Sequence, residues 1–146
     1  AEIDRTAEDF LETTEAEFRH GGDRAFWNKK GDYIALPERE QFTSTEHYYA
    51  TAFHELTHWT GAAHRLDRDM TGRFGDRRYA AEELVAELGA HFLAAEFDME
   101  AATTEDTARY LADWVQLLEN DSKAIFTAAA LASDAVDYSM NLALAY

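Results

Sequence analysis

The sequence predicts an α+β domain that is mainly helical, with a small β-hairpin before a central helix. Five stretches show helical apolar spacing or helix-favouring composition, and most of them follow a capping pattern. Two short apolar segments within 24–37 are separated by a turn that contains Gly31. The 146 residues correspond to about one ordinary domain, so we expect a single domain over 1–146.

The first third of the chain predicts one helix and the hairpin. Apolar residues recur at helical spacing over 3–18, where Thr6 and Asp9 match a capping box. RAFW and YIALP then read as two strands joined by NKKGD, and Pro37 ends the second. The YIALP strand either presents its edge to an extended peptide or belongs to an ordinary core hairpin.

The remaining helices are predicted from capping signals. The box at 43–46 opens a helix that runs to about Thr60, with Gly61 as its stop. The Ala- and Leu-rich stretch 79–97 predicts a third helix, and the box at 103–106 a fourth. Asp121 or Ser122 can cap a fifth helix that begins near 123.

Composition excludes several functional classes. The chain has no cysteine, so a metal would need imidazole and carboxylate ligands. Its formal net charge of -16 opposes binding to a phosphate backbone, and we expect no direct nucleic-acid binding by this fragment. No apolar stretch is long enough for a membrane span and no signal-like N-terminus is present, which predicts a cytoplasmic protein. The arginines of 61–78 either pair with acidic residues or bind an anionic partner.

FHELTHWTG at 53–61 is the motif that carries chemistry. Residues four apart on a helix lie nearly one above the other, so His54 and His58 can direct two imidazoles at one ion. Glu55 then lies where a carboxylate can take a proton from metal-bound water, as metallopeptidases require. The alternative is a pair of histidines that merely fill a helix face.

The third ligand is expected from EELVAE on the following helix. Glu83 and Glu87 share a helix face; we predict that Glu83 binds the ion and that Glu87 accepts a hydrogen bond from the remote nitrogen of a ligand imidazole. Glu82 points about 100° away and is a weaker candidate. Glutamates on such a helix are ordinarily solvated, but an apolar stripe beside this face favours an interior position.

Other polar residues are assigned no ligand role. His91 lies about 12 Å along the axis from Glu83, too far for direct coordination, and we interpret it as a structural or outer residue. His47 and His64 are treated as surface or packed histidines. Four candidates to stabilise an oxyanion have no decisive spacing: Tyr48, Tyr49, Tyr79 and His91.

Nearly the whole chain resembles a known family, with HYYATAFHELTHWTGAAHRL and GRFGDRRYAAEELVAELGAHFLAAE as its most specific blocks. It is similar to the zincin-like metallopeptidase domain that forms the C-terminal part of ArdC-type antirestriction proteins. The resemblance implies a zincin-like fold and a site with His54, His58 and Glu83 as Zn²⁺ ligands and Glu55 as the base. Full-length relatives carry an N-terminal single-stranded DNA-binding domain, and the resemblance implies such a fusion in the full-length protein.

Three functions follow as hypotheses. The first is a zinc metallopeptidase that hydrolyses peptide bonds with a metal-activated water and a glutamate base, in an antirestriction or mobile-element protein. The second is a noncatalytic acidic module that mimics DNA and occupies a DNA-binding protein. The third is a metal-bound domain without turnover that stabilises a larger protein.

Overall fold

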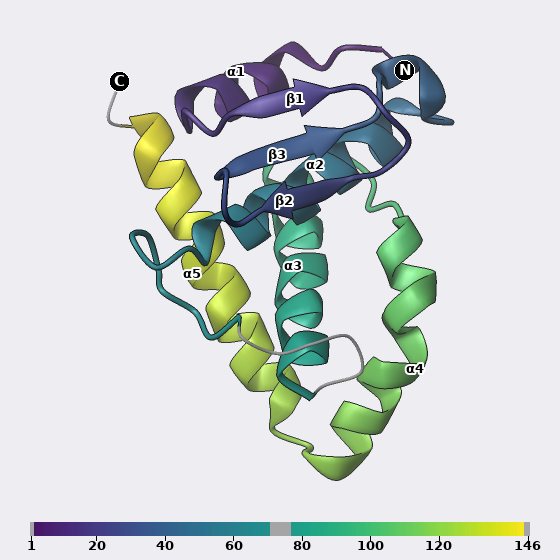
Figure 1. The fold of residues 1–146 in the computed structure, drawn as a ribbon, viewed down its shortest axis with the longest axis vertical. Coiled ribbons are helices and arrows are strands. Elements are labelled where there is room, and N and C mark those ends of the chain that lie inside the picture. The colour runs from purple at the N-terminus through teal and green to yellow at the C-terminus, as the bar shows by residue number, and fades with distance from the viewer. Residues whose placement is uncertain (1, 71–76, 145–146) are drawn as a thin grey trace.

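The computed structural model describes residues 2–70 and 77–144 and contains five α-helices and a small sheet within these ranges (Figure 1). The helices are α1 (Arg5–Thr13), α2 (Thr45–Thr60), α3 (Arg77–Glu96), α4 (Glu105–Asn120) and α5 (Ala124–Leu144). The strands are β1 (Phe18–His20), β2 (Phe26–Asn28) and β3 (Tyr33–Leu36), and a 3₁₀ turn covers Arg39–Gln41. The prediction of a mainly helical α+β fold is confirmed.

The sheet has the strand order β1-β3-β2. β2 and β3 form the predicted antiparallel hairpin, with Trp27 opposite Ile34. β1 adds a parallel strand on the other side of β3, with Arg19 opposite Ala35. Of the two interpretations of the YIALP strand, the free edge is excluded because β3 is paired on both sides, and the core hairpin agrees with the structure. β2 is the edge strand next to the cleft described below.

Helix 3–18 was predicted too long. α1 ends at Thr13 and its N-cap is Asp4, whose side chain accepts a hydrogen bond from the Ala7 backbone. Glu15 then has a φ of 62°, which turns the chain out of the helix. Phe18, expected at the end of the helix, begins β1 instead, because strand pairing with β3 satisfies its backbone and overrides the apolar spacing.

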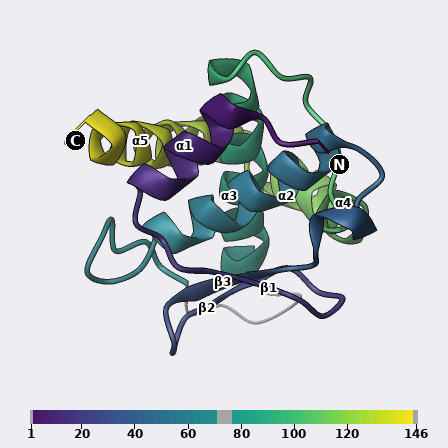
Figure 2. The same ribbon diagram turned by 90° about the horizontal axis from the view of Figure 1, so that it is seen from above.

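Helix α2 is buried on almost every side. The sheet forms a layer on one side of it (Figure 2), and α3 packs on it from another direction. Its aromatic residues Tyr48, Tyr49 and Phe53 meet Ile34 and Leu36 of β3 in the larger core. Ser44 caps the helix by accepting from the His47 backbone. A helix surrounded in this way must place His54 and Glu55 in the interior as well.

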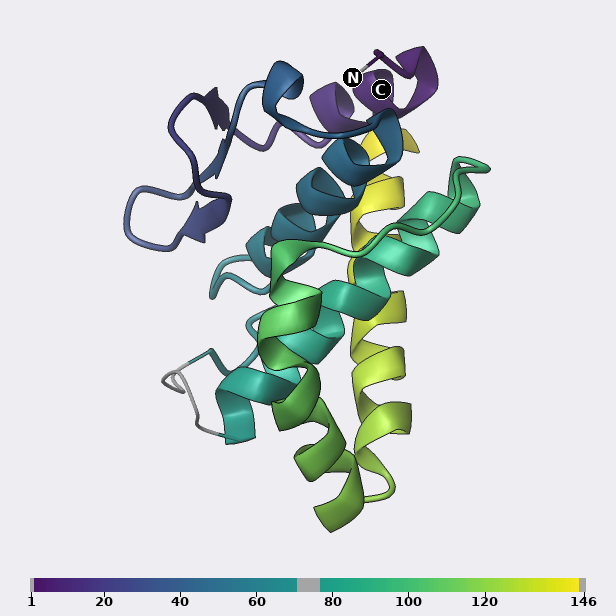
Figure 3. The same cartoon turned by 90° about the vertical axis from the view of Figure 1, so that its right-hand side faces the viewer.

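Helix α3 links the two cores. It lies between α5 and α4 (Figure 1), and the view in Figure 3 separates α4 in front from the long α5 behind. A second core gathers Leu84 and Val85 of α3, Tyr110 and Trp114 of α4, and Ala132 of α5. No helix in the described part of the chain is long and apolar enough to cross a membrane.

Helices α2 and α3 approach closely where Gly89 faces Thr57. A Cβ at Gly89 would lie 2.5 Å from the Thr57 hydroxyl oxygen and 2.6 Å from its methyl carbon. The Thr57 hydroxyl donates to the Phe53 carbonyl, which restricts its freedom to move away. Glycine is unfavourable for helix propensity, but Gly89 has no side chain. It therefore allows α2, which carries the histidines, and α3, which carries the glutamates, to pack this closely.

We expect Gly89→Ala to destabilise the domain. Overpacking costs about 1–3 kcal/mol, whereas the gain in helix propensity is at most about 1 kcal/mol. Urea unfolding measures the free energy of unfolding of both this variant and Ala95→Gly, a control on the exposed face of α3. The control should lose about 1 kcal/mol through propensity alone. A more stable Gly89→Ala would show that the helices are not in tight contact here.

Candidate metal centre

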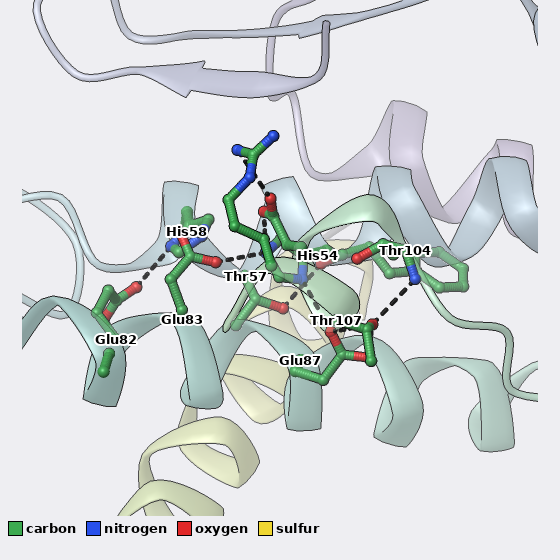
Figure 4. A network of polar contacts seen from close by, with 12 residues as sticks. His54, Thr57, His58, Glu82, Glu83, Glu87, Thr104 and Thr107 are labelled. Atoms are coloured by element: carbon green, nitrogen blue, oxygen red, sulfur yellow. Dashed lines mark hydrogen bonds and ion pairs between the residues drawn. The ribbon is translucent and has the colours of Figure 1, made fainter. Parts of the chain in front are cut away.

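Two histidines and one glutamate converge between α2 and α3. His54 and His58 lie one turn apart on α2, with ring centroids 5.0 Å apart. Glu83 reaches both rings from α3: one carboxylate oxygen lies 3.0 Å from Nε2 of His54 and the other 3.3 Å from Nε2 of His58 (Figure 4). The structure thus brings together the three residues that the sequence predicted as ligands.

This arrangement fits a divalent metal ion. One donor atom from each of His54, His58 and Glu83 lies within 4.8 Å of the others. Ligand atoms around a tetrahedral zinc ion with bonds of about 2.1 Å are separated by roughly 3.4 Å, close to the spacing seen here. Two imidazole nitrogens and one carboxylate also form one of the donor sets of catalytic zinc sites.

Asp106 is a further carboxylate at the site, and the sequence analysis missed it. Its Oδ2 lies 3.1 Å from Nε2 of His54, and it forms a second possible donor group with His54 and Glu55. The sequence pattern assigned Asp106 to a capping box beginning at Thr103. In the structure the box runs from Thr104 to Thr107, one residue later, and Asp106 faces His54 instead. Only the tertiary approach of α4 reveals this role.

Glu55 is buried beside the two imidazoles and is 4% exposed. Burial raises its pKa despite the opposing effect of the charges on His54 and His58. The carboxyl group also lines both cavities that flank the site. A buried carboxyl at the edge of a cleft, beside two candidate metal ligands, is placed to accept and return a proton.

The surrounding carboxylates raise the pKa of both imidazoles. Burial alone would lower the pKa of His54, but hydrogen bonds to Asp106 and Glu83 outweigh it and raise the pKa to about 9. The pKa of His58 is likewise raised, against the effect of burial, by Glu83 and Glu82. The same contacts outweigh burial at Glu83 and lower its pKa. The carboxylates thus favour positive charge at this position.

Glu82 contacts His58 from outside the predicted ligand set. Its Oε2 lies 2.8 Å from Nδ1 of His58, the ring nitrogen remote from Glu83. Burial would raise the pKa of Glu82, but the contacts with His58 and Arg68 outweigh it and lower the pKa. Glu82 was ranked below Glu83 as a ligand, and the structure places it instead against the back of the imidazole.

Glu87 approaches the other histidine without reaching hydrogen-bond distance. Its Oε2 lies 3.7 Å from Nδ1 of His54, and this nitrogen has no hydrogen-bond partner among the described residues. Glu87 instead accepts from the Thr107 hydroxyl at 3.0 Å and pairs with His91 at 3.0 Å. His91 is thus an outer residue that touches Glu87.

The three candidate tyrosines and His47 lie either in the core or along the two cavities at the site. Tyr48 and Tyr49 are buried in the core, where their hydroxyls contact His20 and Glu8 respectively. Tyr79 lines one of the cavities at the site, and it stays a candidate to contact a substrate. His47 lines the other cavity, and its Nδ1 lies 2.7 Å from the Ser44 hydroxyl.

Two cavities of about 280 and 270 Å³ flank the site and meet at Glu55 and Asp106. Most of the side chains that border the first are polar, although Pro37 and Phe42 also line it; besides the shared residues it includes His47, Thr51, Thr43 and Thr104. The second contains aromatic groups, with Phe26, Trp27, Tyr79 and Tyr110 around His58 and Glu83. Ala25, next to β2, borders both, so the two cavities form a cleft that follows this edge of the sheet.

The loop arginines favour the ion-pair interpretation over an anionic partner. Arg65 binds Asp32 through two hydrogen bonds and Arg68 binds Glu82. Arg78 lies 3.7 Å from Asp69. Arg73 lies outside the described residues.

Comparisons with known proteins agree with this geometry. Residues 5–131 match the model of the zincin-like metallopeptidase family. The chain is 40% identical to an uncharacterised protein, y4eC, of Sinorhizobium fredii over 94% of its length, and 44% identical to the DNA primase TraC of Escherichia coli over 90%. It spans 45% of the first relative and 9% of the second.

Solved structures of the antirestriction protein ArdC from plasmid R388 are also similar. The Mn(II)-bound structure matches 97% of this chain with a TM-score of 0.85 and 37% identity. The metal-free structure matches 99% with a TM-score of 0.84 and 39% identity. This chain spans 53% of the ArdC chain in both. Together with the match over residues 5–131, these likenesses show that the chain belongs to the zincin-like metallopeptidase family.

Proposed function

We propose that this domain is a metallopeptidase that hydrolyses peptide bonds and uses Zn²⁺ bound by His54, His58 and Glu83. The observation that carries the proposal is the convergence of these three side chains beside the buried carboxyl of Glu55, at the floor of an open cleft. Family membership supports the fold and a divalent metal, and the site geometry supports the reaction.

A bound divalent ion would polarise the substrate carbonyl and lower the pKa of a water molecule. Glu55 accepts the proton from that water and later donates it to the leaving amine. Because Glu55 is buried, bulk water competes little with the reacting atoms for its carboxyl group. Glu82 holds His58 at Nδ1, which leaves Nε2 directed toward Glu83 and the proposed metal position.

The donor set favours Zn²⁺ but can also accept harder ions. Two imidazoles and one carboxylate suit zinc, while the oxygen of Asp106, 3.1 Å from Nε2 of His54, adds a hard donor next to the site. The ArdC relative was crystallised with Mn(II), an ion for which additional oxygen donors are favourable. We therefore expect zinc as the resident metal and binding of manganese as well.

The edge of β2 is the proposed track for an extended peptide. β2 is paired only with β3, and residues from Arg24 to Trp27 border the cleft. A peptide can add to such an edge through main-chain hydrogen bonds. If it runs antiparallel to β2, its N-terminal side lies at the aromatic cavity and its C-terminal side at the polar cavity that contains Thr51 and His47.

The biological setting follows from the relatives. The similarity to ArdC from plasmid R388 and to the DNA primase TraC supports a mobile-element setting. We propose an antirestriction or mobile-element protein as its context and the cytoplasm as its location. The substrate would be a peptide or protein, and a preceding single-stranded DNA-binding domain is expected in the full-length protein.

The noncatalytic DNA mimic is the second candidate, and the formal net charge of -16 favours it. However, Glu55, Glu82, Glu83 and Glu87 are buried and turned toward imidazoles rather than displayed on the surface. Carboxylates placed in the interior cannot imitate a row of phosphates. The charge distribution at the site therefore supports the enzyme.

Glu55→Gln should abolish hydrolysis and leave the metal bound. The substitution removes the base and none of the three ligands, so we expect turnover to fall by at least about 100-fold. The assay compares the zinc-loaded unchanged domain with zinc-loaded Glu55→Gln in cleavage of a proteome-derived peptide library. Elemental analysis measures the metal content of both. Glu46→Gln, on the exposed first turn of the same helix, is the matched control and should retain activity.

Retained turnover in Glu55→Gln would contradict the proposed base. The DNA mimic predicts instead that binding to a DNA-binding protein survives this substitution and weakens steeply with salt. Stoichiometric zinc without cleavage of any peptide by the unmodified domain would favour a noncatalytic metal-bound module.

Strand addition at β2 predicts an alternating response to changes in the substrate backbone. A cleavable peptide is N-methylated at one residue at a time, which removes one main-chain donor and leaves every side chain unchanged. Methylation at every second position should raise KM strongly, because only alternate N–H groups face β2. The intervening positions serve as internal controls. Equal tolerance at all positions away from the scissile bond would exclude pairing with β2.

A further inference from the structure

The loop that follows α2 sends one buried arginine to the back of the metal centre. The guanidinium of Arg68 donates through Nε to one oxygen of Glu82 at 2.9 Å and through Nη2 to the other at 3.1 Å. Glu82 in turn lies 2.8 Å from Nδ1 of His58. The side chains of Arg68 and Glu82 are 5% and 10% exposed, so the chain Arg68–Glu82–His58 is largely shielded from water.

The same guanidinium is also anchored to the C-terminal turn of α2. Nη2 donates to the Thr57 carbonyl at 2.6 Å, and Nη1 donates to the Thr60 hydroxyl at 2.9 Å. Arg68 therefore holds the carboxylate of Glu82, from α3, in a fixed position relative to the turn of α2 that carries His58. A planar group with several donors in fixed directions can do this, whereas an ammonium group cannot match all of these contacts.

The absence of a side chain at Gly61 leaves room for the guanidinium of Arg68. A Cβ at Gly61 would lie 2.7 Å from Nη2 and 2.9 Å from Cζ of Arg68, and it would also meet the end of the Met70 side chain. Gly61 was predicted only as the helix stop. In the structure its missing side chain also leaves the space through which the guanidinium reaches Glu82.

The two imidazoles are held differently as a result. His58 has Glu82 behind it at hydrogen-bond distance, whereas Nδ1 of His54 has no hydrogen-bond partner among the described residues. A hydrogen bond to the remote nitrogen of a ligand histidine fixes the orientation of the ring and strengthens it as a ligand; loss of such support commonly costs 10- to 100-fold in metal affinity. A buried carboxylate keeps this role only while a cation accompanies it.

We propose that Arg68 is a positioning residue for the metal centre: it holds Glu82 against His58 and thereby sets the affinity and coordination geometry of the bound ion. This inference rests on the proposed metal centre and adds a contribution from outside the ligand set. Arg68 then stabilises metal binding through Glu82 and not as a ligand.

Arg65 provides a matched control within the same loop. It is also largely buried, at 9% side-chain exposure, and it forms an ion pair at 2.6 Å with Asp32. It additionally stacks on Trp59, with its guanidinium carbon 3.6 Å from the ring centroid. Asp32 does not contact either ligand histidine in the described structure, so loss of Arg65 tests the general effect of removing a buried loop arginine.

The experiment is a Co(II) titration of the whole domain, which gives the affinity and the visible spectrum of the bound ion together. Arg68→Met should bind Co(II) about 10- to 100-fold more weakly and with an altered spectrum. Arg65→Met should stay within about threefold of the unchanged domain, because the contacts of Arg65 in the described structure are with Asp32 and Trp59 and not with a ligand side chain or Glu82. Arg68→Lys keeps the charge but loses the bidentate contact with Glu82, so its Co(II) affinity should lie between those of Arg68→Met and Arg65→Met. It remains informative if Arg68→Met does not fold.

A double-mutant cycle with Glu82→Gln separates the proposed path from a general structural effect. If Arg68 acts through Glu82, then Arg68→Met should weaken Co(II) binding far less in the Glu82→Gln background than in the unchanged domain. Equal losses in both backgrounds, or equal losses for Arg68→Met and Arg65→Met, would overturn the inference while leaving the metal centre intact. Failure of the unchanged domain to bind Co(II) would instead overturn the metal centre itself, and this inference with it.

Discussion

The burial of several carboxylates around two imidazoles is the constraint on which the rest of the site depends. Glu55, Glu82, Glu83 and the partly exposed Asp106 converge on His54 and His58 between three helices. Such a concentration of negative charge is costly away from water unless positive charge accompanies it. The surrounding carboxylates raise the pKa of both imidazoles and so favour positive charge there. A divalent ion bound at this position would offset the same negative charge.

The fold meets this constraint by making α2 an interior helix. The sheet, α3 and the aromatic core surround it, and the contact between Gly89 and Thr57 allows α3 to approach. The glutamates of α3 consequently reach the imidazoles across the helix interface, and α4 closes the third side with Asp106. Arg68 forms an ion pair with Glu82, which contacts His58. Residues of β2 border the cleft, where an extended peptide can be placed.

The sequence predicts the parts of the site that depend on local helical geometry. Spacing of four residues places His54 over His58, and the position of Glu83 on the next helix follows from its apolar neighbours. The contribution of Asp106 depends on how α4 packs against α2, and that of Arg68 depends on a loop path, so neither has a local signal. The same distinction holds for the fold: the hairpin was predictable from its turn, whereas β1 required a parallel pairing across about fifteen residues, which periodicity alone does not specify.

The most direct measurement is anomalous diffraction at the zinc absorption edge from a crystal of the zinc-loaded domain. The account predicts one strong peak between α2 and α3, about 2.0–2.2 Å from Nε2 of His54, Nε2 of His58 and a carboxylate oxygen of Glu83. A peak elsewhere, or no peak at this position in a crystal grown with abundant zinc, would contradict it.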